Sequence, residues 1–114
     1  MDINVTTREI NETAAALEVA GEIDVYASPS VKEAINGLID KNFTNLIISL
    51  EEVRYIDSTG LGVLIGALKK IREKEGKVLI VCANPQLKKI FNITGLVRIF
   101  SMYETMADAE IALG

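Results

Sequence analysis

The sequence predicts an α/β fold: a single mixed, mostly parallel β-sheet of about five strands with about four helices packed on it. Two short and nearly continuous apolar runs, 46–50 and 78–82, indicate central strands covered on both faces. Segments with helical periodicity alternate with these runs, which implies parallel strands joined by right-handed crossovers. The 114 residues, 49% of them hydrophobic and 25% charged, are expected to form one domain, 1–114.

The first third of the chain predicts a hairpin followed by a helix. Residues 3–6 and 17–20 alternate apolar and polar positions, and a turn is expected at Asn11-Glu12, so the two strands should pair as a hairpin. Ser28 and Pro29 predict a helix start, because serine caps free amides and proline suits the first helical position. The apolar face of this helix is expected to comprise Val31, Ala34, Ile35, Leu38 and Ile39.

After the first central strand the pattern predicts a long helix, ended by Gly76, with the apolar stripe Leu61, Leu64, Ile65, Leu68 and Ile71. Val53, Tyr55 and Ile56 are expected to pack the loop before it. The remaining elements are expected as a strand at 77–82, a short helix at 85–92, an edge strand at 98–100 and a last helix from Thr105. Thr105 and Asp108 resemble a capping box for that helix, whose apolar residues are Met106, Ala109 and Leu113.

Composition argues against several classes of function. The net charge of −4 disfavours nucleic-acid binding, which needs a basic surface. The cations between 69 and 74 are interleaved with Glu73 and Glu75, as in a solvated helix end. No secretory signal and no apolar run of about 20 residues is present, so a cytoplasmic protein without a membrane segment is expected. The lone Cys82 lies in an apolar run and should be a buried small hydrophobe.

The glycines from 60 to 66 look like a nucleotide-binding loop but do not fit one. The third glycine of a dinucleotide fingerprint would come one position earlier, and the acid expected about 20 residues later is missing. A Walker-type loop would need lysine in place of Ala67. Without histidine no Ser-His-acid triad exists, although a serine–lysine pair and paired carboxylates at Asp24 and Asp57 stay open. The sequence therefore predicts no enzyme, no cofactor and no metal site.

The segment Asp57-Ser58-Thr59-Gly60-Leu61-Gly62 carries the most information about function. It places a serine hydroxyl at the start of a helix among small residues, either as a helix cap or as a group presented for modification. At 100° per residue, the face opposite the apolar stripe is small and uncharged over two turns and would let another backbone approach closely. That face comprises Thr59, Gly62, Val63 and Gly66. An isolated surface valine is the other interpretation of Val63.

A second acid is expected at the same end of the sheet. Gly21-Glu22-Ile23-Asp24 ends the second strand, and parallel central strands would bring this junction close to the Asp57 loop. Asp24 would then lie near Ser58. Alternatively, Asp24 only stabilises its own turn.

These two motifs, residues 57–62 preceded by residues 21–24, resemble a STAS domain and, more narrowly, the bacterial anti-sigma factor antagonists. The resemblance covers essentially the whole chain. It implies that an anti-sigma factor, an ATP-dependent serine kinase, phosphorylates the serine after the aspartate. The unphosphorylated form would bind that kinase and free the sigma factor, and a serine phosphatase would reset the switch.

On this resemblance Ser58 is the phosphate acceptor, Asp57 its neighbour and Asp24 the other acid beside the site. Thr59 stands where many relatives have serine or alanine, so its hydroxyl could compete as acceptor. The expected partner-binding residues are Asp24, Asp57, Ser58, Thr59, Gly60, Gly62, Val63 and Gly66. STAS domains also occur as scaffold subunits of stressosomes and of lipid-transport complexes without a phospho-switch, which is the alternative role. The intact serine favours the switch.

Overall fold

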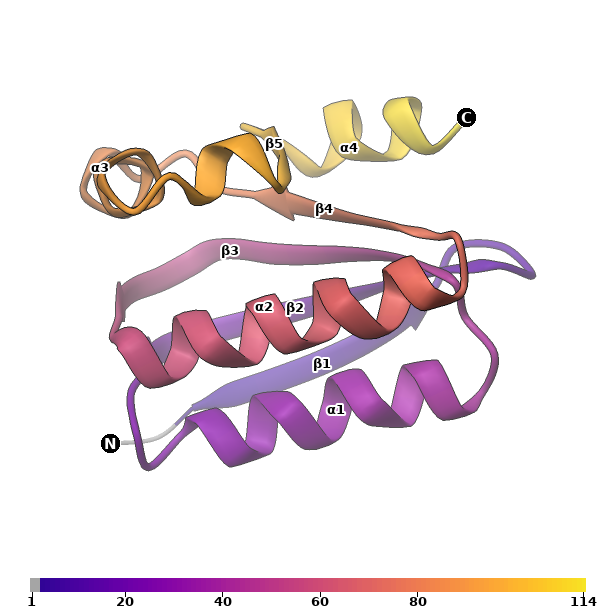
Figure 1. Ribbon diagram of the computed structural model, residues 1–114, viewed down its shortest axis with the longest axis horizontal. Helices are drawn as coiled ribbons and strands as arrows, with labels where there is room; N and C mark the ends of the chain where they lie inside the picture. Colours follow the sequence, from indigo (N-terminus) through magenta and orange to yellow (C-terminus); the bar gives the residue numbers. More distant parts are fainter. Residues whose placement is uncertain (1–2) are drawn as a thin grey trace.

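The computed structural model describes residues 3–114 and confirms the α/β class (Figure 1). One sheet has the strand order β1-β2-β3-β4-β5. Strand β1 (Asn4–Glu9) pairs antiparallel with β2 (Ala14–Ile23), as the predicted hairpin requires. Strands β3 (Asn45–Ile56), β4 (Lys77–Val81) and β5 (Ser101–Tyr103) continue parallel to β2.

Four helices cover the sheet unequally (Figure 1). They are α1 (Ser28–Asp40), α2 (Ser58–Glu73), α3 (Pro85–Ile93) and α4 (Met106–Leu113). Buried residues of α1, α2 and α3 join one large core with the strand residues of one sheet face. A smaller core under α4 holds Ala16, Ile47, Leu79, Val81 and Ala109. The apolar periodicity of the sequence thus identified the packed face of α1, α3 and α4, but in α2 it omitted the buried Ala67 and the half-buried Val63.

Strand β3 is longer than its apolar run predicted. It continues beyond Leu50 to Ile56, so Val53, Tyr55 and Ile56 belong to a strand and not to a loop. Val53 and Ile56 are buried, whereas Tyr55 is 48% exposed. The extension carries the chain directly to Asp57 at the carboxyl edge of the sheet.

The predicted edge strand at 98–100 was wrong in position. Leu96–Arg98 forms a turn of 3₁₀ helix after Gly95, whose φ is 77°, and the edge strand β5 begins only at Ser101. Leu96 and Phe100 are both buried, four residues apart, at a spacing that suits a helical turn. The Phe100 ring packs edge-on against Phe91, with 6.1 Å between ring centroids.

Two helix starts differ in how well the sequence predicted them. Thr105 caps α4 as expected, its Oγ1 accepting a hydrogen bond from the Asp108 N–H at 3.1 Å. Ser28 was wrongly predicted as a cap, because Ala27 occupies the cap position of α1 without a side-chain hydrogen bond. Ser28 is instead the first residue of α1 and is buried, and the preceding turn is held by Asp24.

Cys82 is buried, as predicted, at 2% exposure. Burial raises the pKa of its thiol, which keeps the group protonated and unreactive. Across residues 3–114 no helix combines the length and the apolar character that crossing a bilayer requires.

Candidate functional site

The ends of β2 and β3 bring the two sequence motifs together. Ile23 and Ile56 are partners in the parallel ladder, and the Asp57 N–H donates to the Ile23 carbonyl at 3.1 Å. Asp24 and Asp57 directly follow these two residues, so both acids lie at the carboxyl edge of the sheet, where α1 and α2 begin (Figure 1). The predicted convergence of the two motifs is therefore present in the fold.

Asp57, and not Ser58, caps α2. Its Oδ1 accepts a hydrogen bond from the Gly60 N–H at 3.0 Å, and its carbonyl accepts one from the Leu61 N–H at 3.0 Å. Ser58 is the first residue of the helix and is exposed. Within residues 3–114 its hydroxyl makes no hydrogen bond, so the serine has no capping role in the fold.

Asp24 stabilises its own turn, which was one of its two interpretations. Its Oδ1 accepts hydrogen bonds from the N–H groups of Tyr26 at 3.0 Å and Ala27 at 2.9 Å. Its carbonyl accepts a third from the Ser28 N–H at 2.8 Å. The carboxylate is only half-buried, and its Oδ2 accepts no hydrogen bond from the part of the chain that the structure describes. Asp24 thus combines a structural role with an accessible oxygen.

Gly60 permits the close contact between α2 and the strand ends. A Cβ at this buried position would lie 2.7 Å from Ile56 Cγ1 and 2.8 Å from both Cγ2 and the carbonyl oxygen of Ile23. Real Cβ atoms do not approach other atoms so closely. Sequence reasoning identified Gly60 only through its motif, because the contacts come from two separate strands.

At Gly62 and Gly66, the other two glycines of α2, no steric contact requires glycine. A Cβ at Gly62 or Gly66 would meet nothing within 4 Å. Glycine inside a helix costs about 0.5–1 kcal/mol relative to alanine. The fold of the isolated domain therefore does not explain either residue.

The four residues predicted as a docking strip do not form one outward face. Thr59 and Gly62 are exposed, whereas Val63 and Gly66 are half-buried on the side of α2 that faces α1. The helical wheel missed this difference because it ignores the neighbouring helix. Binding by these residues remains a prediction.

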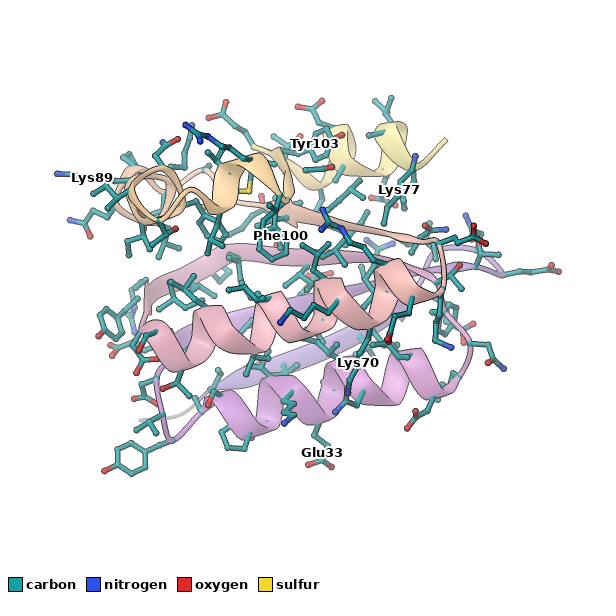
Figure 2. The ribbon with its side chains drawn as sticks, in the orientation of Figure 1. Glu33, Lys70, Lys77, Lys89, Phe100 and Tyr103 are labelled. Carbon is teal, nitrogen blue, oxygen red and sulfur yellow. The ribbon has the colours of Figure 1, made fainter. Side chains whose placement is uncertain are left out.

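Val63 and Gly66 line a groove of about 200 Å³ between α1 and α2. Its other lining residues are Lys32, Ile35, Asn36, Ala67 and Lys70. Lys70 extends from α2 toward α1 (Figure 2), and its Nζ donates to Asn36 Oδ1 at 2.8 Å. Val63 is therefore part of the contact between the helices as well as of the surface.

Sequence reasoning missed three exposed apolar side chains at this edge. Val25 is 54% exposed, Tyr26 is 89% exposed and Tyr55 is 48% exposed. The available signal was the pair Val25-Tyr26 immediately after Asp24, because a turn rarely needs two apolar residues. In the described residues 3–114, no group of three or more histidine, cysteine or acidic side chains gathers as a metal site.

Comparison with known proteins identifies the family. The STAS domain model matches residues 4–109. The chain belongs to the STAS family. An anti-sigma-B factor antagonist of Listeria monocytogenes is 41% identical over 96 residues, 84% of each chain. The crystal structure of an anti-sigma factor antagonist from Mycobacterium paratuberculosis has a TM-score of 0.87 at 28% identity, covering 97% of this chain and 93% of that one.

More distant structures share only the fold. SpoIIAA in its unphosphorylated form has a TM-score of 0.75 at 17% identity, covering 96% of each chain. The phosphorylated form of this Bacillus cell fate determinant has a TM-score of 0.77 at 19% identity, covering 97% of this chain and all of that one. The STAS fold therefore exists with and without a phosphate in that protein.

Proposed function

We propose that this protein is an anti-sigma factor antagonist switched by phosphorylation of Ser58. The unphosphorylated form binds an anti-sigma factor and so releases the sigma factor that this factor holds. The observation that carries the proposal is the exposed Ser58, whose hydroxyl has no role in the fold although it starts a helix. The names of the relatives support an anti-sigma factor as partner.

In this proposal the anti-sigma factor is also the ATP-dependent serine kinase, and a serine phosphatase restores the active form. The protein itself catalyses nothing. Ser58 has no base within hydrogen-bond reach in the described residues, so it suits a group that is modified better than one that attacks. The switch operates in the cytoplasm, where ATP and the sigma factor are found.

The residues around Ser58 take distinct roles. Asp57 caps the first turn of α2, and Gly60, which has no side chain, lets that turn pack closely against the ends of β2 and β3. The accessible oxygen of Asp24 helps to place the serine or the metal-bound nucleotide of the kinase. Thr59 and Gly62 form the exposed part of the docking surface.

Ser58→Ala is expected to abolish phosphorylation but to retain binding to the anti-sigma factor, because a methyl group fills nearly the same space as the hydroxymethyl. The wild type and the variant are incubated with Mg-ATP and each purified anti-sigma kinase of the source organism. The phosphate is then mapped by peptide mass spectrometry. Thr59→Val is the matched control, and it should still accept phosphate on Ser58.

Phosphate found on Thr59 or on the exposed Ser30 would contradict this assignment. Ser28 is buried at 3% exposure and should not react in the folded protein. A wild type that receives no phosphate from any of the kinases would favour the scaffold role instead.

Gly62→Ala is expected to stabilise the protein and to weaken partner binding. The added methyl meets open space in the free domain, so the helix gains about 0.5–1 kcal/mol, or roughly 2–4 °C in melting midpoint. In the complex the methyl would separate two closely approaching backbones, which should lower affinity at least about tenfold, the equivalent of about 1.4 kcal/mol.

Gly37→Ala is the control for this prediction. Gly37 is exposed in α1, a Cβ there also meets nothing within 4 Å, and it lies about 14 Å along the helix from Ser28. It should give the same rise in melting temperature with unchanged affinity. Equal affinities of the Gly62 and Gly37 variants would remove Gly62 from the docking surface.

A further inference from the structure

We propose that Tyr26 is an anchor residue for the anti-sigma factor, and that its ring enters an apolar pocket rimmed by basic side chains on that partner. This inference rests on the proposed function, because it takes the anti-sigma factor as partner. It adds a contact residue in the turn that precedes α1, outside the motif that contains Ser58.

The exposure of Tyr26 is extreme but would not by itself carry the inference. Tyr26 is 89% exposed, more than any other large hydrophobic residue described. Single exposed apolar residues are common on protein surfaces. Three further features distinguish Tyr26 from them: the rigidity of its backbone, its position and the charge around it.

The backbone of Tyr26 is fixed. Its own N–H donates to Asp24 Oδ1 at 3.0 Å, and the next N–H, of Ala27, donates to the same oxygen at 2.9 Å. Ala27 and Ser28, which follow, are both buried. A tyrosine on a fixed turn has only two side-chain torsions to order on binding, so the entropic cost of its burial is small. Tyrosine is also enriched among the residues that dominate binding energies.

The position of Tyr26 is continuous with the Ser58 site. It follows Asp24 by two residues, and Asp24 lies beside Asp57 at the ends of paired strands. The half-exposed Tyr55 lies on the neighbouring strand, where its ladder partner is Glu22. A partner that reaches Ser58 at this edge would therefore also meet Tyr26, in the turn between β2 and α1, and Tyr55, on β3.

The charge of this edge indicates the chemistry of the partner. Segments 20–31 and 55–68 contain Glu22, Asp24 and Asp57 but no lysine, arginine or histidine. The nearest cations along the chain, Lys32 and Arg54, lie just outside these segments and leave the edge acidic. Acidic groups around an aromatic side chain match a pocket with basic groups at its rim. The same charge opposes an anionic membrane or a nucleic acid, so a protein surface is the occupant that fits.

The test compares Tyr26→Ser with Ile111→Ser by isothermal titration. The probe is the purified anti-sigma kinase that phosphorylates Ser58. Ile111 is 77% exposed on α4, which packs on the opposite face of the sheet, so its variant controls for loss of exposed apolar area. Tyr26→Ser should lower affinity about thirtyfold or more, as expected for an anchor residue. Ile111→Ser should leave affinity unchanged, and both variants should melt within about 2 °C of wild type, as expected for exposed positions.

Two further arms test the chemistry of the pocket. Tyr26→Phe should keep affinity within about threefold, because the ring supplies most of the apolar area. Raising the salt concentration should weaken wild-type binding, because basic groups facing Asp24 and Asp57 would be screened. An affinity that does not change with salt concentration would contradict the proposed basic side chains at the rim of the partner's pocket.

The outcomes separate this inference from the proposed function. If phosphorylation of Ser58 abolishes binding while Tyr26→Ser binds as tightly as wild type, the inference fails and the function stands. If neither change affects binding, both fail. A self-association that Tyr26→Ser removes, seen by analytical ultracentrifugation without the kinase, would make a second copy of the chain the occupant and would also overturn the inference.

Discussion

Replacing Gly76 with alanine is expected to destabilise the protein by about 3 kcal/mol or more, at the upper end of the cost of overpacking. A Cβ at Gly76 would lie 1.6 Å from the carbonyl oxygen of Thr44 and 3.0 Å from Ile71 Cγ2. The Thr44 carbonyl belongs to a backbone that cannot easily move, because the N–H groups of Thr44 and Asn45 both donate to Thr13 at 3.0 Å. The chain entering β4 or the one entering β3 must therefore shift.

Thermal melting measures this effect, and Gly66→Ala is the matched control. At about 4 °C per kcal/mol for this size, Gly76→Ala should melt about 12 °C or more below wild type. Gly66→Ala makes the same chemical change in α2 where a Cβ meets nothing, so its melting midpoint should rise slightly. A Gly76 variant that melts within about 3 °C of wild type would show that the two loops adjust at little cost.

Gly76 also shows what the sequence could and could not predict about the fold. The pattern correctly indicated that the long helix stops before this glycine. A glycine that ends a helix usually takes the left-handed conformation itself, but here Glu75 takes it, at φ 60°, and the Gly76 N–H donates to the Ile71 carbonyl. The close approach of Thr44 comes from a distant part of the chain, which no local pattern reports.

The candidate site was likewise predicted in part from the sequence. The order of strands and helices sufficed to place Asp24 and Asp57 at one edge, since parallel strands end together. Side-chain detail did not follow from the pattern: Asp57 and not Ser58 caps α2, and Val63 turns toward α1. The cap of α2 and the burial of Val63 depend on hydrogen bonds and neighbouring helices that form only in the folded chain.

Phosphorylation of Ser58 is expected to lower affinity for the anti-sigma factor by at least a hundredfold while leaving the fold intact. Phosphate adds about −1.5 to −2 charges and three acceptor oxygens, which would take the net charge from −4 to roughly −6. At the interface this group must be desolvated against a surface shaped for a hydroxyl, which costs several kcal/mol. A loss of about 2.8 kcal/mol already corresponds to a hundredfold.

In the free protein two opposing effects nearly cancel. The N–H groups of Ser58 and Thr59 precede the first intrahelical donor, the Leu61 N–H, so they have no acceptor within the helix. The amino terminus of α2 therefore favours a dianion by about 0.3–1 kcal/mol. Asp57 repels it by a similar amount, because its carboxylate is held beside the site by the Gly60 N–H but is partly screened by solvent. Stability should therefore change little.

Titration against the anti-sigma factor, thermal melting and amide chemical shifts of the two forms test both halves of this prediction. Phosphatase treatment is the control and should restore the affinity of the phosphorylated sample. Shift changes should be confined to the first turns of α2, the Asp24 turn and the end of β3. A fall in melting midpoint beyond about 5 °C, more than about 1 kcal/mol for a domain of this size, would instead mean that phosphate acts by loosening the fold. Shift changes spread across β4 and β5 would lead to the same conclusion, because those strands carry no residue of the site and could sense the phosphate only through the sheet.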